Sequence, residues 1–372
     1  MDECKQGYIL VVGSAYGENV LQLKSKMIAG QKHNIVCHEL LGGSGLDYTL
    51  RLINASIPAF PILPLGSDKL GHYIQEEIIA SVKRTELPKQ LLQFVNSEDF
   101  FVPNAATARS FNLVEKDRRT SFVEQARGNL KFKDFVKQRL ENLATYEDIN
   151  INSVMIGNIN SDSPDLNPSK PGECTSYLIQ QFYNKSLIFC NFGNSQICMG
   201  ANFWEESLKH ISVLQLNLHE VRGLLAQKDE KFSLVDIIEW FKERSITAVI
   251  TLDKFGAIGS YKSGKDGVIL AWPYESINTI DTTGAGDAFG AGLISVLSRN
   301  ADFHFRDFYR AIKEASLWAA YACTTLGGAS NCPSGSILNS YKKNITAQGL
   351  HYIEVEDAGK MKRILQLLDK AY

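Results

Sequence analysis

Short apolar runs rich in β-forming residues recur along this chain, and they constrain its fold more than any other feature. The first is YILVV at residues 8–12, which ends at Gly13 and Ser14. Similar runs occupy four later segments, residues 153–156, 186–190, 213–216 and 247–252. Strands that are apolar on both sides are buried on both faces, as the central strands of a parallel sheet are.

Helix-compatible segments lie between several of these runs. Apolar residues return at three- and four-residue spacing over residues 175–184, 234–244 and 308–324, which is typical of a helix that packs one face on a sheet. This alternation predicts an α/β fold with a largely parallel central sheet and helices on both faces.

Two segments interrupt this rhythm, residues 23–41 and 101–129. They are more polar, and they contain short alternating stretches at residues 34–40 and 110–114 that are typical of antiparallel strands. We expect them to form a small β-rich lid outside the main sheet. No Pro/Gly/Ser-rich linker divides the chain, so residues 1–333 are predicted to form one domain. Residues 334–372 are predicted to form a C-terminal appendage with a terminal helix.

Composition excludes several classes of function. The 39 Lys and Arg residues nearly cancel the 41 Asp and Glu residues, which argues against a nucleic-acid partner. No long uncharged apolar segment predicts a membrane helix, and the first residues do not resemble a signal peptide, so we expect a cytoplasmic protein. The cysteines and histidines show neither C-x-x-C nor metal-ligand spacing.

A glycine-rich turn at residues 280–293 (IDTTGAGDAFGAGL) carries the strongest chemical signal. Because Gly284, Ala285 and Gly286 have almost no side chains, their amides could converge on an anion at the N-terminus of a helix that begins near Asp287. A carboxylate there could accept a proton from a hydroxyl that attacks a phosphoryl group. Taken alone, G-A-G-D is also compatible with an ordinary turn and an N-capping Asp.

The longer string DTTGAGDAFGAG closely resembles the C-terminal signature of the ribokinase-like (PfkB) carbohydrate kinase family. The resemblance implies a ribokinase-like fold that uses ATP. It implies that Gly284, Ala285 and Gly286 form the anion hole for the transferred phosphate, and that Asp287 is the catalytic base. Asp281 resembles a residue that helps to hold a monovalent cation, such as K⁺, in several members. No G-x-x-x-x-G-K-[ST] string is present, which disfavours a P-loop kinase.

The N-terminal part of the chain extends the resemblance. LGGSGLDYTLRL at residues 41–52 resembles the family's Gly-Gly signature, in which Gly42 and Gly43 lie against the sugar. Asp47 stands where many sugar kinases carry Asn. Near the first strand, Glu18 replaces the usual Asp that grips substrate hydroxyls, and Tyr16 could stack on a ring.

Five further residues match the nucleotide side of the family. Asn217 and Glu220 form its N-x-x-E pattern, and their oxygens could organise the water shell of Mg²⁺, although N-x-x-E is also a common helix start. Thr251 and Gly256 resemble the segment that leads to the nucleotide pocket. Ser316 is expected to lie near adenine. In PLGSDKLG, Asp68 and Gly71 are expected to be structural.

These features predict an ATP-dependent, Mg²⁺-dependent kinase that phosphorylates a hydroxyl of a small sugar or polyol. A nucleoside kinase of the same superfamily is the second hypothesis, and a catalytically silent ligand-binding homologue is the third. A dinucleotide-dependent oxidoreductase is disfavoured because GSAYGE after the first strand is not G-x-G-x-x-G. We also expect that a homodimer could form through the lid.

Charge adds an expectation about the acceptor. Glu18 and Asp47 would place two carboxylates in one pocket, which favours a neutral acceptor rich in hydroxyl donors. A phosphorylated acceptor would need compensation from Arg109, Arg118 or Arg119 of the lid.

Overall fold

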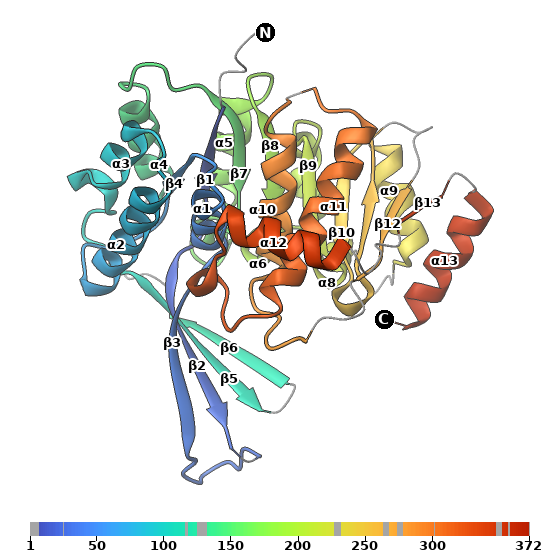
Figure 1. Ribbon diagram of the computed structural model, residues 1–372, viewed down its shortest axis with the longest axis horizontal. Helices are drawn as coiled ribbons and strands as arrows, with labels where there is room; N and C mark the ends of the chain where they lie inside the picture. Colours follow the sequence, from blue (N-terminus) through green and yellow to red (C-terminus); the bar gives the residue numbers. More distant parts are fainter. Residues whose placement is uncertain are drawn as a thin grey trace.

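The main body of the protein is built on a nine-stranded sheet, which Figure 1 shows behind a layer of helices. The computed structural model describes residues 7–24, 26–115, 118–124, 132–226, 232–262, 268–273, 278–300, 302–346, 352–355 and 358–371. The order of the strands across the sheet is β13-β12-β11-β10-β9-β8-β7-β1-β4. The neighbours from β4 to β10 pair in parallel, and β11 to β13 are added antiparallel.

The predicted apolar runs form the parallel centre of this sheet. The strands of the main sheet are β1 (Tyr8–Val12), β4 (Ala59–Ile62), β7 (Ile151–Ile156), β8 (Leu187–Asn191), β9 (Val213–Asn217), β10 (Ala248–Thr251), β11 (Ala257–Ser260), β12 (Val268–Ala271) and β13 (Tyr352–Val355). The side chains of residues 9–12 are fully buried, as expected for a strand covered on both faces. Pro61 lies in β4, and its missing N–H is tolerated because β4 is an edge strand.

Helices flank the sheet as the sequence predicts. Their bounds are α1 (Ser44–Asn54), α2 (Lys69–Arg84), α3 (Lys89–Val95), α4 (Phe132–Leu143), α5 (Glu173–Phe182), α6 (Asn194–Ile197), α7 (Gly200–Leu208), α8 (Leu218–Leu225), α9 (Leu234–Glu243), α10 (Ala285–Leu297), α11 (Phe305–Ala322), α12 (Gly335–Thr346) and α13 (Ala358–Ala371). In Figure 1, α1, α10 and α11 lie together in front of the sheet. None of the described helices combines the length and the apolar composition that a bilayer crossing requires.

The lid is a separate four-stranded sheet that projects from the main body (Figure 1). Its order is β3-β2-β5-β6, with β2 (Tyr16–Leu23), β3 (Ile35–Gly42), β5 (Ala108–Glu115) and β6 (Arg118–Glu124). The strand β2 precedes the predicted lid segment, and it joins the lid because the chain turns out of the main sheet at residues 13–15. Within the predicted segment 101–129, residues 116–117 and 125–129 lie outside the described part of the chain.

The C-terminal segment packs against the main body. The strand β13 pairs antiparallel with β12, and α13 contacts α9. Arg222 of α8 forms an ion pair with Asp369 of α13, at 2.6 Å between Nη2 and Oδ1. The division of the chain at residue 333 stays a prediction.

The turn before α2 has the structural role that the sequence predicts. Asp68 is the N-cap of α2, and its Oδ1 accepts hydrogen bonds from the amide of Gly71 and the hydroxyl of Thr107, both at 2.8 Å. Its Oδ2 accepts from the amide of Thr107, also at 2.8 Å. A Cβ on Gly71 would stand 1.9 Å from the carbonyl oxygen of Gly66, so only glycine fits there. Asp68 therefore fastens the start of α2 to the segment that enters β5.

We predict that Asp68→Ala lowers the free energy of unfolding by about 1–2 kcal/mol at pH 7, the usual loss for an N-cap. Burial alone would raise the pKa of Asp68, but the hydrogen bonds from Gly71 and Thr107 outweigh it and lower the pKa. The contribution is therefore complete above the ordinary carboxyl pKa of about 4 and is lost as the pH falls through the lower folded-state value. Urea unfolding at pH 7 and below pH 4 measures both effects, with the exposed Asp302→Ala as control. Equal stability of Asp68→Ala and the parent at pH 7 would contradict the assignment.

Candidate active site

The glycine-rich turn forms the N-terminus of α10. Gly284 is the N-cap and has a φ of 74°, a left-handed conformation that favours glycine. The amide of Ala285 donates to the carbonyl oxygen of Thr282 at 3.2 Å. Within the described residues, the amides of Gly284, Gly286 and Asp287 have no hydrogen-bond acceptor. These three donors are therefore available to an anion.

Asp281 fastens this turn to the loop that follows α11. Its Oδ1 accepts from the amide and the hydroxyl of Thr283, at 3.0 and 2.8 Å. Its Oδ2 accepts from the amide of Gly327 at 2.9 Å. The amide of Ile280 also donates to the carbonyl oxygen of Cys323 at 2.8 Å. The sequence predicts that Asp281 helps to hold a cation. In the structure its carboxylate accepts three hydrogen bonds that shape the turn.

An ion pair buried in α1 lies against the same turn. Asp47 and Arg51 are one helical turn apart, with 2.5 Å between Arg51 Nε and Asp47 Oδ1 and side chains that are only 2–3 % exposed. Arg51 Nη2 also donates to the carbonyl oxygen of Gly328 at 3.1 Å. The sequence suggested that Asp47 would face the acceptor as a second uncompensated carboxylate. The structure differs, because Arg51 neutralises it.

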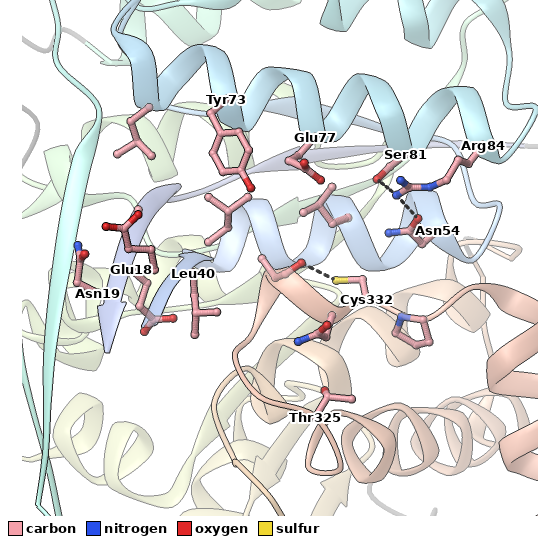
Figure 2. Close-up of a pocket in the computed structure, with 18 of the residues that line it drawn as sticks. Glu18, Asn19, Leu40, Asn54, Tyr73, Glu77, Ser81, Arg84, Thr325 and Cys332 are labelled. Carbon is pink, nitrogen blue, oxygen red and sulfur yellow. Dashed lines mark hydrogen bonds between the residues drawn. The ribbon is translucent and has the colours of Figure 1, made fainter. Parts of the chain in front are cut away.

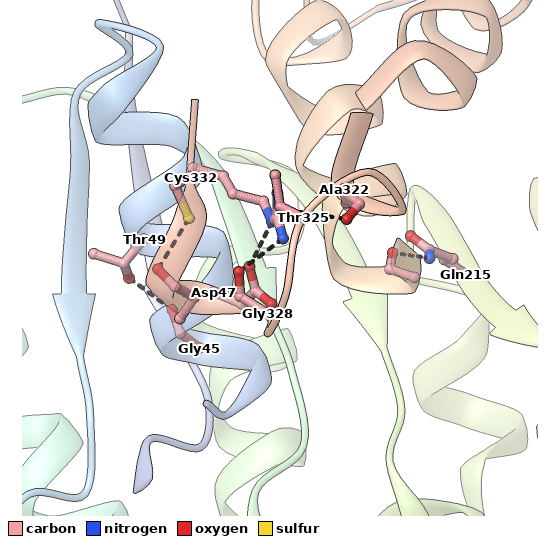
Figure 3. Close-up of polar contacts among 11 residues, drawn as sticks. Gly45, Asp47, Thr49, Gln215, Ala322, Thr325, Gly328 and Cys332 are labelled. Atoms are coloured by element: carbon pink, nitrogen blue, oxygen red, sulfur yellow. Dashed lines mark hydrogen bonds and ion pairs between the residues drawn. The ribbon is translucent and has the colours of Figure 1, made fainter. Parts of the chain in front are cut away.

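Two glycines make room for this ion pair. A Cβ on Gly284 or on Gly328 would stand 2.6 Å from Asp47 Oδ2, and one on Gly284 would stand 3.2 Å from Arg51 Nη2. Figure 3 shows Asp47 and Gly328 facing each other where α1 meets the loop after α11. The ion pair is therefore in direct contact with the N-cap of α10.

Asp287 is half-buried in a cluster of like charges. Burial raises its pKa well above the usual value, and the carboxylates of Asp47, Glu220 and Glu18 raise it further, whereas Arg51 opposes them. A carboxylate with a raised pKa is a stronger base while it is ionised. Asp287 therefore lies at the start of α10 in surroundings that disfavour its ionised form.

Gln215 of β9 holds the first turn of α10 from the sheet side. Its Nε2 donates to the carbonyl oxygen of Gly286 at 2.8 Å, and its Oε1 accepts from the hydroxyl of Tyr48 at 3.4 Å. A Cβ on Gly290 would stand 1.7 Å from that hydroxyl oxygen, so the helix can approach only because residue 290 is glycine. The backbone of Gly286 is thereby positioned by the central sheet.

Glu18 and the Gly-Gly pair meet at the base of the lid. Glu18 is 3 % exposed, and its Oε1 accepts from Asn112 Nδ2 of β5 at 2.6 Å. A Cβ on Gly42 would stand 3.2 Å from Glu18 Oε2 and 2.7 Å from the ring of Tyr16. Gly43 has a φ of 103° and packs on Ser14. Glu18, Gly42 and Tyr16 are thus brought together as the sequence suggested.

A cavity of about 740 Å³ opens at the base of the lid. Figure 2 shows Tyr73 and Glu77 of α2 on one side of it and Thr325 and Cys332 on the other. Among the predicted site residues only Glu18 lines it. Its lining includes Leu50 and Asn54 of α1 but neither Asp47 nor Arg51 of the same helix.

Of the three lid arginines that could compensate a phosphorylated acceptor, the structure describes the side chain of Arg109 alone. Arg109 is exposed and lines the cavity at the base of the lid. The side chains of Arg118 and Arg119 lie outside the described part of the structure. The cation paired with Asp47 is Arg51 of the same helix.

Asn217 and Glu220 form the N-terminal capping box of α8. Asn217 Oδ1 accepts from the amide of Glu220, and Glu220 Oε2 accepts from the amide of Asn217, both at 2.8 Å. Burial raises the pKa of Glu220, and the hydrogen bond from Asn217 opposes this shift. Glu220 Oε1 has no hydrogen-bond partner within the described residues. One carboxylate oxygen therefore shapes the helix, and the other can still bind water.

The remaining nucleotide-side residues are placed by the strands and by α11. Thr251 ends β10 and pairs with Asn217 on β9. Gly256 has a φ of 90°, and a Cβ there would stand 1.9 Å from the carbonyl oxygen of Ala271, so the hairpin itself requires this glycine. Ser316 donates to the carbonyl oxygen of Ile312 within α11 at 2.9 Å.

Sequence reasoning missed Arg51, Tyr48 and Gln215. Asp47 and Arg51 are four residues apart on a predicted helix, a spacing that indicates an ion pair and could have suggested it. No local signal marks Tyr48 or Gln215, because their contact is made across the fold. No group of three or more His, Cys, Asp or Glu side chains suited to a metal ion occurs within the described ranges.

Comparison with known proteins gives matches over part of the sequence. The model of the pfkB family carbohydrate kinase matches residues 194–334. Aminoimidazole riboside kinase of Salmonella typhimurium is 33% identical over 95 residues, which span 26% of this chain and 28% of that protein.

Solved structures match over most of the chain. The structure of ribokinase from Giardia lamblia matches with a TM-score of 0.68 at 16% sequence identity. The match covers 91% of this chain and 99% of that one. A Burkholderia thailandensis nucleoside kinase in complex with inosine has a TM-score of 0.64 at 15% identity, covering 90% of this chain and 97% of that one. The resemblance found in the sequence is confirmed: residues 194–334 match the pfkB family of carbohydrate kinases, and the fold is that of ribokinase-family kinases.

Proposed function

We propose that this chain is an ATP-dependent kinase that transfers the γ-phosphate to a hydroxyl group of a small sugar or polyol. The observation that carries the proposal is the N-terminus of α10, where the carboxylate of Asp287 lies beside three amides without acceptors. A base and an anion site in contact are what phosphoryl transfer to an alcohol requires. The match of residues 194–334 to the pfkB family supports the same reaction.

Each group of residues then has a part in the reaction. Asp287 accepts the proton of the attacking hydroxyl, and its raised pKa suits that role. The amides of Gly284, Gly286 and Asp287 bind the transferred phosphoryl group as its charge spreads over its oxygens. Gln215 holds the carbonyl of Gly286 and so keeps these amides in position.

Two metal ions are included in the proposal. Glu220 would act on Mg²⁺ through water, because its Oε1 is an oxygen donor without a protein partner in the described residues. Mg²⁺ would neutralise charge on the nucleotide phosphates. Asp281 would contribute to a K⁺ site only in addition to the hydrogen bonds it accepts from Thr283 and Gly327. Thr251, Gly256 and Ser316 remain the proposed nucleotide neighbours.

The acceptor is proposed to lie beside Glu18, Gly42 and Gly43. Because Arg51 neutralises Asp47, Glu18 alone would supply the carboxylate at the glycine wall. A nucleoside is the second candidate, and the ring of Tyr16 next to Gly42 supports it because a base or sugar could stack there. The partial sequence match to an aminoimidazole riboside kinase points in the same direction.

A homodimer through the lid and a cytoplasmic location complete the proposal. Ile35 and Val36 on β3, with Phe122 and Val123 on β6, expose between 38% and 58% of their surface. Apolar side chains on the two edge strands of the lid would be covered by a second copy. Sedimentation of the parent and of Phe122→Ser would test this part separately from the activity.

Phosphorylation assays with panels of sugars and nucleosides test the reaction, and Asp287→Asn tests the base. We expect turnover with at least one acceptor, and a loss of about 100-fold or more in Asp287→Asn with ATP affinity nearly unchanged. Asp307→Asn is the matched control, because Asp307 occupies the same position of α11 that Asp287 occupies in α10. A parent that binds ATP without phosphorylating any acceptor would support the silent homologue instead.

The two glycines of the turn should respond differently to substitution. Gly284→Ala should lower both stability and turnover, because its Cβ would meet Asp47 and its φ is left-handed. Gly286→Ala should fold normally, because a Cβ there has nothing within 4 Å, but its methyl group should weaken ATP use if it enters the anion site. Melting temperatures and kcat/KM for ATP separate the two effects. Unchanged kinetics in Gly286→Ala would place the anion elsewhere.

We predict that Glu220→Gln raises the Mg²⁺ concentration needed for half-maximal activity by several-fold. Glutamine preserves the capping box, since Glu and Gln both serve at that helix position, so the fold should be retained. Asp236→Asn in the capping box of α9 is the matched control and should leave the metal titration unchanged. If Glu220→Gln titrates like the parent, Glu220 is a helix-start residue only.

A further inference from the structure

The environment of Arg51 is unusual for a residue whose only role is structural. Its guanidinium is almost completely buried, at 2 % exposure, which is costly unless its charge is compensated. It also lies next to Gly284, the N-cap of α10. Helix N-termini carry partial positive charge, so a cation there opposes the helix dipole. An anion that binds both the helix N-terminus and the guanidinium would offset this unfavourable interaction.

The guanidinium has unused donors. It carries five N–H groups. Nε donates to Asp47 and Nη2 to the carbonyl oxygen of Gly328. Nη1 has no partner within the described residues, and it is not among their fully buried unpartnered atoms. Arg51 can therefore donate further hydrogen bonds without breaking the ones that it makes.

The charges around Asp287 also indicate a role for the Arg51 guanidinium. Three other carboxylates act on Asp287, those of Asp47, Glu220 and Glu18, and Arg51 is the cation that opposes them. A triphosphate that approaches the amides of α10 would meet this negative cluster. A fixed protein cation would reduce the repulsion at the transferred group itself.

We infer that Arg51 binds the γ-phosphoryl group of the nucleotide at the N-terminus of α10, with Asp47 holding its guanidinium in place. This inference rests on the proposed kinase function. It adds a side chain from α1 to the backbone amides of the anion site. Asp47 is then a positioning residue that acts through Arg51.

A purely structural role makes a different prediction. If Arg51 only neutralises Asp47, removing both charges together should leave nucleotide binding unchanged, because buried ion pairs can often be replaced without loss of stability. Asp47→Asn combined with Arg51→Gln does this with side chains that can still hydrogen-bond to each other. A phosphate contact would not be restored by that replacement.

The affinities for β,γ-imido-ATP and ADP, measured by calorimetry, provide the test, because only the first carries a γ-phosphate. We expect the double variant to bind ADP within about twofold of the parent and the ATP analogue about tenfold or more weakly. The matched control is Asp99→Asn with Arg139→Gln, because Arg139 is a second buried arginine, paired at 2.6 Å with Asp99 and hydrogen-bonded to Ser97 and to the carbonyl oxygen of Phe94. It should keep the parental ratio of the two affinities.

The outcomes separate the two proposals. A folded double variant with the parental ratio overturns the role of Arg51 and leaves the kinase function standing. A parent that binds neither nucleotide overturns both. If the double variant does not fold, Arg51→Lys decides, because it keeps the charge but cannot form two parallel hydrogen bonds to a phosphate. We then expect the affinity for the ATP analogue, relative to that for ADP, to fall about threefold. An unchanged relative affinity would refute the contact.

Discussion

Two opposite charges on one turn of α1, Asp47 and Arg51, are both removed from water, and two distant segments are arranged around them. The cost of burying each charge is offset by the partner and by the carbonyl of Gly328. The N-cap of α10 and the loop after α11 can close on the pair only because glycines stand at 284 and 328. The position of Asp287, one turn into α10, follows from that contact.

The parallel sheet supplies the rest of the geometry. Gln215 near the carboxyl end of β9 holds Gly286, and the capping box of Asn217 and Glu220 follows at the end of the same strand. Ligands of open α/β sheets bind beyond the carboxyl ends of their strands. Burial there, together with the neighbouring carboxylates, raises the pKa of Asp287. The lid adds Glu18 from the side.

The sequence predicted the parts whose cause is local. Residues 9–12 are apolar without interruption because both faces of β1 are covered, so periodicity alone identifies the strand. The glycine turn before Asp287 was also readable, since its backbone conformation requires glycine. The burial of Arg51 was not, because it depends on Gly284 and Gly328, which lie far along the chain. Gly256 and Glu220 were assigned to ligands by resemblance, and each also has a structural role. The hairpin requires glycine at position 256, and Glu220 completes the capping box of α8.

The loop after α11 is attached at two consecutive residues to groups of opposite charge. The amide of Gly327 donates to Asp281 at 2.9 Å, and the carbonyl of Gly328 accepts from Arg51 at 3.1 Å. One inserted residue would displace the chain by about 3.5 Å, which is more than a hydrogen bond tolerates. Loop length at this point is therefore fixed by the two hydrogen bonds together. A chain that keeps both charged partners cannot gain a residue here without losing one of these bonds.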